Sequence, residues 1–153
     1  MKAKVYVDGS FSVINNKGVY SGGIVLLLDG LDQPLYHKCV GDDTNVARLR
    51  NVAGELMAVV TTLGILQNIP KCQELEICYD YTGIEKWVTG EWKANKAFTR
   101  AYRNAMIEAQ KKLKITFTKV DAHTGVMYNE KADKLAKEAI KDYARDIQSS
   151  NLT

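Results

Sequence analysis

Apolar and polar residues alternate along the first forty positions, which is the pattern of β-strands buried on one face. Three strands separated by polar turns are expected here, over residues 4–10, 19–29 and 35–41. The first strand is expected to end in Asp8, Gly9 and Ser10, which are a carboxylate, a glycine and a hydroxyl. Short turns between consecutive strands predict an antiparallel meander.

After residue 50 the hydrophobic period changes to that of an amphipathic helix. Apolar residues between Val52 and Leu66 recur three and four positions apart, and the helix is expected to end before Pro70. The remaining pattern predicts, in order, a strand at 75–79, helices at 82–88 and 97–113, a strand at 115–120 and a helix at 129–147.

The resulting order, βββαβααβα, predicts an α/β fold. A mixed five-stranded sheet is expected, with three antiparallel strands followed by two parallel additions and helices flanking it. The sequence contains no internal repeat or linker. We therefore expect one domain over residues 1–148 and a disordered tail at 149–153.

Composition places the chain among ordinary soluble domains, with 153 residues, 46% hydrophobic and 25% charged. The net charge of +3 permits a polyanionic partner without requiring one. No signal peptide precedes the first strand, and the longest apolar run, residues 24–28, is too short to cross a bilayer. Three cysteines without metal-type spacing indicate reduced thiols. We therefore expect a cytoplasmic monomer that does not enter a membrane.

Four carboxylates stand in notable places: Asp8 and Asp80 at the ends of strands, and Glu55 and Asp133 in helices. Each one alone could be a turn, a cap or a solvated charge, except Glu55, whose neighbours are almost all apolar. Ligands of such sheets bind beyond the carboxyl ends of the strands. If the four acids converge, their mutual repulsion requires raised pKa values or bound cations. Oxygen ligands favour Mg²⁺ or Mn²⁺ over zinc.

The chain resembles the type 1 ribonuclease H family from end to end. Four motifs carry the resemblance: Val7-Asp8-Gly9-Ser10, Gly54-Glu55-Leu56-Met57-Ala58, Asp80-Tyr81-Thr82-Gly83-Ile84-Glu85-Lys86-Trp87, and His123-Thr124-Gly125 followed by Asn129-Glu130-Lys131-Ala132-Asp133-Lys134-Leu135-Ala136. Their details are most similar to the bacterial variant found with viroplasmin-type hybrid-binding modules, and no such module is present in this sequence.

The resemblance implies a ribonuclease H-like fold and a metal-dependent endonuclease that cuts the RNA strand of RNA/DNA hybrids. The products would carry 5′-phosphate and 3′-hydroxyl ends, and the cellular role would be removal of primers and R-loops. Two Mg²⁺ ions, or Mn²⁺, would be held by the four acids Asp8, Glu55, Asp80 and Asp133. Glu55 would also lie nearest the ribose 2′-hydroxyl. His123 would move a proton or assist product release.

The same resemblance implies a set of substrate-binding residues: Gly9, Ser10, Arg48, Arg50, Asn51, Trp87, Trp92, Lys93 and Asn129. Arg50 stands where many relatives carry a threonine in a pocket for a DNA phosphate. Basic and aromatic residues together between 86 and 103 suit a nucleic-acid strand. The alternatives are that Trp87 belongs to the core and that the charges form a solvated helix face.

Two other classes of function compete with this hypothesis. The first is a nuclease or strand-transfer enzyme of the same broad fold, such as an integrase-like or resolvase-like protein. The spacing of His123 and Asp133 and the context of Glu55 argue against it. The second is a nucleic-acid-binding protein without catalysis. The presence of all four acids and His123 argues against that reading, because clustered acids are costly to keep.

Overall fold

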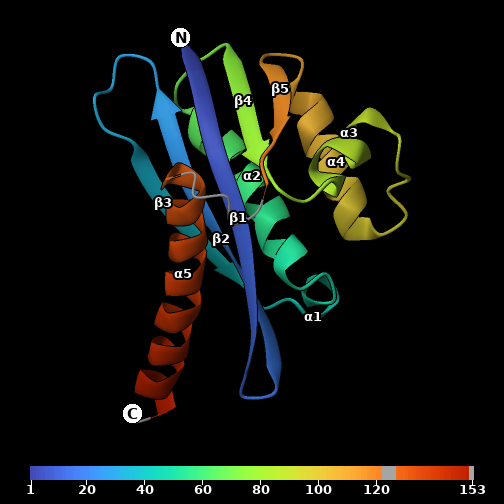
Figure 1. Ribbon diagram of the computed structural model, residues 1–153. Helices are drawn as coiled ribbons and strands as arrows, with labels where there is room; N and C mark the ends of the chain where they lie inside the picture. Colours follow the sequence, from blue (N-terminus) through green and yellow to red (C-terminus); the bar gives the residue numbers. More distant parts are fainter. Residues whose placement is uncertain (122–126, 152–153) are drawn as a thin grey trace.

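A five-stranded mixed sheet in the order β3-β2-β1-β4-β5 forms the centre of the computed structural model, which describes residues 1–121 and 127–151 (Figure 1). The antiparallel part consists of β1 (Lys2–Ile14), β2 (Lys17–Leu28) and β3 (Leu35–Gly41). The parallel part adds β4 (Glu74–Tyr79) beside β1 and then β5 (Lys114–Lys119). The predicted α/β fold and its mixed sheet are confirmed.

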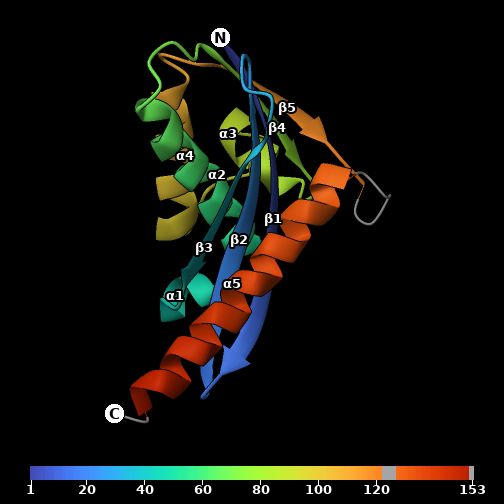
Figure 2. The ribbon, with the colours of Figure 1, turned by 90° about the vertical axis from the view of Figure 1, so that its left-hand side faces the viewer.

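Within the described residues, five helices accompany the sheet: α1 (Thr44–Ala47), α2 (Asn51–Gln67), α3 (Gly83–Thr89), α4 (Ala97–Ala109) and α5 (Met127–Asn151). Figure 2 shows α2 and α4 on one side of the sheet and α5 running diagonally along the other. None of the helices in the described part of the chain has the length and apolarity needed to cross a bilayer.

Several helices differ from the sequence-based prediction. The short helix α1 lies where no helix was expected, and its start is stabilised because the Asp43 side chain accepts hydrogen bonds from the N–H groups of Asn45 and Val46. Helix α4 ends at Ala109, four residues early. Helix α5 continues to Asn151, so residues 149–151 are helical although they were expected in a disordered tail.

The first strand does not end at Ser10, as the sequence suggested, but continues to Ile14. Antiparallel pairing with β2 supports it over its whole length, from Ala3 opposite Leu28 to Ile14 opposite Lys17. Strand β4 pairs with β1 only as far as Tyr6. Asp8 therefore lies inside a continuous strand, at the point where the parallel neighbour has ended and one edge of β1 is open.

The main core lies between the sheet and α2. Its buried residues include Val5 and Ile24 from the sheet and Leu56 and Val59 from the helix. A smaller cluster on the opposite face joins Val25 to α5 through Ala132 and Leu135. Burial of these side chains stabilises the fold by about 25 cal/mol for each Å² of apolar surface removed from water.

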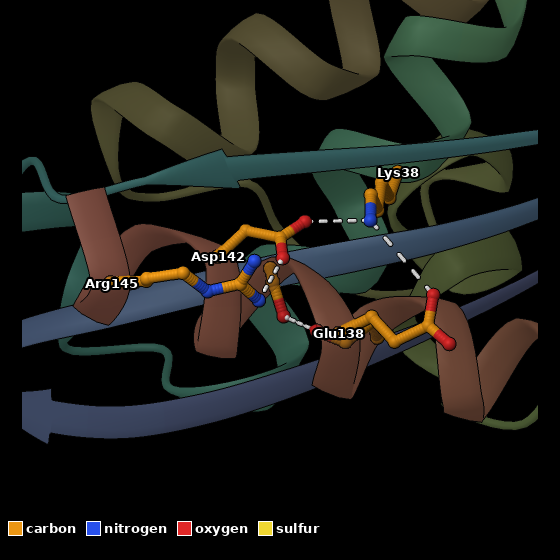
Figure 3. Close-up of polar contacts among 6 residues, drawn as sticks. Lys38, Glu138, Asp142 and Arg145 are labelled. Atoms are coloured by element: carbon orange, nitrogen blue, oxygen red, sulfur yellow. Dashed lines mark hydrogen bonds and ion pairs between the residues drawn. The ribbon is translucent and has the colours of Figure 1, made fainter.

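Exposed ion pairs connect α5 to the edge strand β3 (Figure 3). Lys38 Nζ lies 2.6 Å from Asp142 Oδ2 and 3.9 Å from Glu138 Oε2, and Arg145 Nη2 lies 3.0 Å from Asp142 Oδ1. Pairs as exposed as these contribute little stability because water screens them. The buried contacts of α5 with β2 hold the helix, including a 2.6 Å hydrogen bond from Ser21 Oγ to the carbonyl oxygen of Ala136.

Candidate active site

Three of the four carboxylates share one hollow of about 150 Å³, which we call the acidic hollow. Asp8 reaches it from β1, Asp80 from the residue after β4, and Asp133 from α5. Its lining is completed by Gly9, Asn51, Asn129 and Glu130. Residues separated by more than 120 positions in the chain thus meet at the point where β1 and β4 part.

Glu55, the fourth carboxylate, lies beside this hollow and is only 3% exposed. Its Oε1 accepts a hydrogen bond of 3.1 Å from the backbone N–H of Asp80, and the backbone N–H of Tyr81 also donates to it. The turn that carries Asp80 therefore also fixes the direction of the Glu55 carboxylate.

Close backbone contacts bring these carboxylates together. A Cβ atom on Gly9 would lie 2.0 Å from the carbonyl oxygen of Asn51, so β1 touches the first turn of α2. A Cβ on Gly54 would lie 1.7 Å from the carbonyl oxygen of Ser21 on β2. Only glycine permits such approaches. Glu55 directly follows Gly54, so the depth of its carboxylate depends on this contact.

The opposite face of β2 has the same kind of contact. A Cβ on Gly23 would lie 1.8 Å from the carbonyl oxygen of Ala132 on α5. Asp133 is the next residue of that helix. Each helix thus contacts the backbone of β2 at the residue just before its carboxylate. Glu55 follows the contact on one face of the sheet, and Asp133 follows the contact on the other face.

Burial and mutual repulsion raise the pKa values of two of these acids. Burial raises the pKa of Asp8 to about 7, with contributions from the charges of Asp80 and Asp133, while the Gly9 N–H at 2.9 Å opposes the shift. Burial likewise raises the pKa of Glu55 well above its ordinary value, and the charge of Asp80 adds to this. Repulsion of this kind favours binding of protons or cations.

Replacing Asp8 with Asn should remove a pH dependence of stability. In the folded protein Asp8 has a pKa of about 7, against an ordinary value of 3.8, so the folded state binds the proton more tightly. The free energy of unfolding should therefore fall as pH rises from about 4 to about 7. Asp8→Asn should be more stable than the original chain at pH 8, by on the order of 2 kcal/mol.

Urea unfolding in EDTA at pH 5 and pH 8 measures this difference. The matched control is Asp32→Asn in an exposed turn, which should keep the original decline. An equal pH dependence of the free energy of unfolding in Asp8→Asn and the original chain would show that the pKa of Asp8 is not raised in the folded protein.

The donor chemistry of the hollow fits a hard divalent cation, because all of its charged groups are carboxylates. Among the described residues, no three His, Cys, Asp or Glu side chains are gathered closely enough to hold a metal ion as they stand. Lys137 Nζ lies 2.9 Å from Asp133 Oδ2 and supplies positive charge at the edge. Cation binding would therefore require the acids to draw together.

The structure brings only some of the expected substrate-binding residues together. Gly9, Asn51 and Asn129 line the acidic hollow, and the Asn129 side chain is buried. Ser10 lies further along β1, and Arg48 is exposed at the end of α1. Arg50 is exposed before α2 and has a positive φ of 56°, and its guanidinium lies 5.1 Å from the ring centre of Phe11.

A second hollow, of about 380 Å³, lies along the loop before α4 and the first part of that helix. Its basic and amide residues are Lys93, Asn95, Arg100, Arg103 and Asn104, and Trp92 lines it as well. We call this the basic hollow. Trp87 does not line it: this side chain is 8% exposed and packs between Tyr81 and Trp92. Trp87 is therefore a core residue, which was one of the alternatives in the sequence-based prediction.

Two further residues complete the account of the site. His123 lies outside the described residues, so its expected role stays a prediction. Glu130 lines the acidic hollow although the sequence had not singled it out. Its signal was its position three residues before Asp133, which places both on one face of α5.

Comparison with known proteins gives a consistent result. The family model described as RNase H matches residues 1–141. A ribonuclease H of Mesorhizobium japonicum is 29% identical over 154 residues, covering 94% of this chain and 81% of that protein. A ribonuclease H of Francisella tularensis subsp. novicida is 30% identical over 148 residues, covering 90% of each chain.

Solved structures share the fold. RNase H1 from Halobacterium salinarum superposes with a TM-score of 0.72 at 24% identity, covering 93% of this chain and 99% of that one. LC11-RNase H1, solved in complex with an RNA/DNA hybrid, superposes with a TM-score of 0.63 at 17% identity, covering 90% of this chain and 99% of that one.

Proposed function

This chain belongs to the ribonuclease H family, and on that basis we propose that it hydrolyses the RNA strand of RNA/DNA hybrids with two divalent cations. The observation that supports this most is the shared hollow of Asp8, Asp80 and Asp133, with Glu55 beside it. The cellular role we propose is removal of replication primers and R-loops.

The reaction is an in-line displacement at phosphorus. A water oxygen bonds to the phosphorus, the bond from phosphorus to O3′ breaks, and a proton ends on O3′, giving a 5′-phosphate and a 3′-hydroxyl. Divalent cations held by the carboxylates would supply the charge that activates the water and stabilises the leaving oxygen. The charge of four carboxylates would balance that of two such ions. We propose Mg²⁺, with Mn²⁺ as the alternative.

The protein side chains orient the substrate. Glu55 is held by two backbone N–H groups, which fix the direction of its carboxylate. We propose that this carboxylate is the one nearest the ribose 2′-hydroxyl. The amides of Asn51 and Asn129 line the same hollow and offer both donors and acceptors to a ribose 2′-hydroxyl. Recognition of this hydroxyl distinguishes RNA from DNA.

Cleavage of defined substrates tests the proposal. End-labelled RNA/DNA hybrid, double-stranded RNA and double-stranded DNA should be incubated with Mg²⁺, Mn²⁺ or EDTA. Internal cuts are expected only in the RNA of the hybrid and only with a divalent cation. Binding without cleavage in either metal would favour the non-catalytic alternative, and cuts in DNA would favour a different nuclease of this fold.

The basic hollow is proposed to bind phosphates of the hybrid. Lys93→Ala should therefore raise KM for the hybrid several-fold with little change in kcat. Each lost phosphate contact should also reduce the slope of log affinity against log salt by about one. Lys112→Ala removes the same charge from an exposed position outside the hollow and serves as the control. Equal KM values and salt slopes for the two variants would contradict the assignment.

A further inference from the structure

One side-chain hydrogen bond spans the segment that carries Asp80. Tyr79 is the last residue of β4, and its hydroxyl donates to Glu85 Oε2 across 2.6 Å. Glu85 lies in the first turn of α3. Asp80 is the first of the five residues, 80–84, that lie between these two in the chain, so the bond closes a short loop that contains Asp80.

The two ends of this loop are held in different ways. On the strand side, the N–H of Val120 donates to the carbonyl oxygen of Tyr79 at 2.7 Å, which anchors the end of β4. On the helix side, Thr82 stands at the N-cap of α3 without a side-chain cap hydrogen bond. Backbone hydrogen bonds at this end run from the N–H of Ile84 to the carbonyl oxygen of Tyr81 at 3.0 Å, and from the N–H groups of Glu85 and Lys86 to the carbonyl oxygen of Thr82 at 3.3 and 3.2 Å. The bond between Tyr79 and Glu85 adds a side-chain contact to these and joins the start of α3 to the end of β4.

The Tyr79 ring and its hydroxyl have separable roles. The ring is 2% exposed and packs edge-on against Phe117 at a centroid distance of 6.2 Å. It would fill the core without the hydroxyl. The hydroxyl makes a separate hydrogen bond to a half-buried carboxylate on the next element. This bond is directional, unlike the packing of the ring.

We propose that Glu85 is a positioning residue for cleavage, which acts through the Tyr79 hydroxyl to fix the direction of Asp80 and of the backbone N–H groups that hold Glu55. This inference rests on the proposed function, because it concerns the same acidic hollow. A displacement of about 1 Å at a reacting group can reduce a rate by as much as 10²-fold. Loss of one supporting contact should have a smaller effect, which we expect to be about tenfold.

Four variants test the inference. Tyr79→Phe and Glu85→Ala should each lower kcat about tenfold, with KM for the hybrid unchanged. The double variant should be no slower than either single variant, because both remove the same contact. Glu85→Gln should retain nearly full kcat, since its amide oxygen can still accept the Tyr79 hydroxyl.

A matched control separates positioning from stability. Tyr143→Phe removes another tyrosine hydroxyl that donates to a carboxylate across 2.6 Å, in this case Asp42. Tyr143 lies ten residues after Asp133, about 15 Å further along α5. Tyr143→Phe should lower the melting temperature and leave kcat unchanged at a temperature well below it.

A second readout does not depend on cleavage. The rise in melting temperature on adding Mg²⁺ should be smaller for Tyr79→Phe than for Tyr143→Phe or the original chain. If the original chain cleaves hybrids but Tyr79→Phe matches it in kcat and in its Mg²⁺ response, the positioning role is wrong and the proposed function stands. If the original chain does not cleave, the proposed function fails, and equal Mg²⁺ responses would overturn the positioning role independently.

Discussion

Asp80→Asn should lower kcat for hybrid cleavage by on the order of 10³-fold while the fold remains intact. Asparagine has nearly the shape of aspartate but lacks the negative charge that a divalent cation needs. The metal-free protein should be as stable as the original or more so, because the charge of Asp80 raises the pKa values of both Asp8 and Glu55. Steady-state cleavage of a labelled hybrid, circular dichroism and thermal unfolding measure these effects.

Asp32→Asn provides the control, since it makes the same chemical change in an exposed turn and should cleave normally. Addition of Mg²⁺ should raise the melting temperature of this control more than that of Asp80→Asn. Full activity in Asp80→Asn would show that the assignment of metal ligands is wrong.

Gly54→Ala should destabilise the protein by about 3 kcal/mol or more. The added Cβ would lie 1.7 Å from the carbonyl oxygen of Ser21, and both atoms belong to buried backbone that cannot rotate away. Helix α2 would have to move off β2 and would carry Glu55 with it. Urea unfolding, or the yield of soluble protein if the variant fails to fold, measures the effect.

Gly64→Ala makes the same substitution ten residues later in the same helix. Nothing lies within 4 Å of its added Cβ. Alanine is the better helix former, so this variant should be more stable by about 0.5–1 kcal/mol. Similar unfolding midpoints for the two variants would mean that the contact between Gly54 and Ser21 does not limit the packing.

The element order could be read from the sequence because each period is local. Alternating strands, helical spacing after Val52 and the strand before Asp80 all depend on neighbouring residues. The resemblance to ribonuclease H, confirmed by the family match, rested on motifs that surround the four acids. Because these motifs match the family around each acid, the convergence of the four acids could also be expected. Their catalytic roles stay a prediction.

Other features depend on pairing between distant segments and had no local signal. Strand β1 continues past Ser10 because β2 lies beside it, and Asp8-Gly9 looks like a turn when the partner is unknown. The contact between Gly54 and Ser21 joins a helix to a strand more than thirty residues earlier. The burial of Trp87 follows from its packing against Tyr81 and Trp92. The sequence alone does not show that these three rings meet.

The position of Asp8 within an unbroken strand also bears on how the molecule opens. Local fluctuations that open a loop or a helix end leave the hydrogen bonds between central strands intact. The amide protons of central strands are therefore among the last in a protein to exchange with solvent. Asp8 lies in such a strand, and Gly9 beside it touches the first turn of α2 near Glu55. These two carboxylates therefore belong to the same cooperative unit, whereas Asp80 stands where that unit passes into the short helix α3. Partial opening should therefore release Asp80 before Asp8 and Glu55 separate.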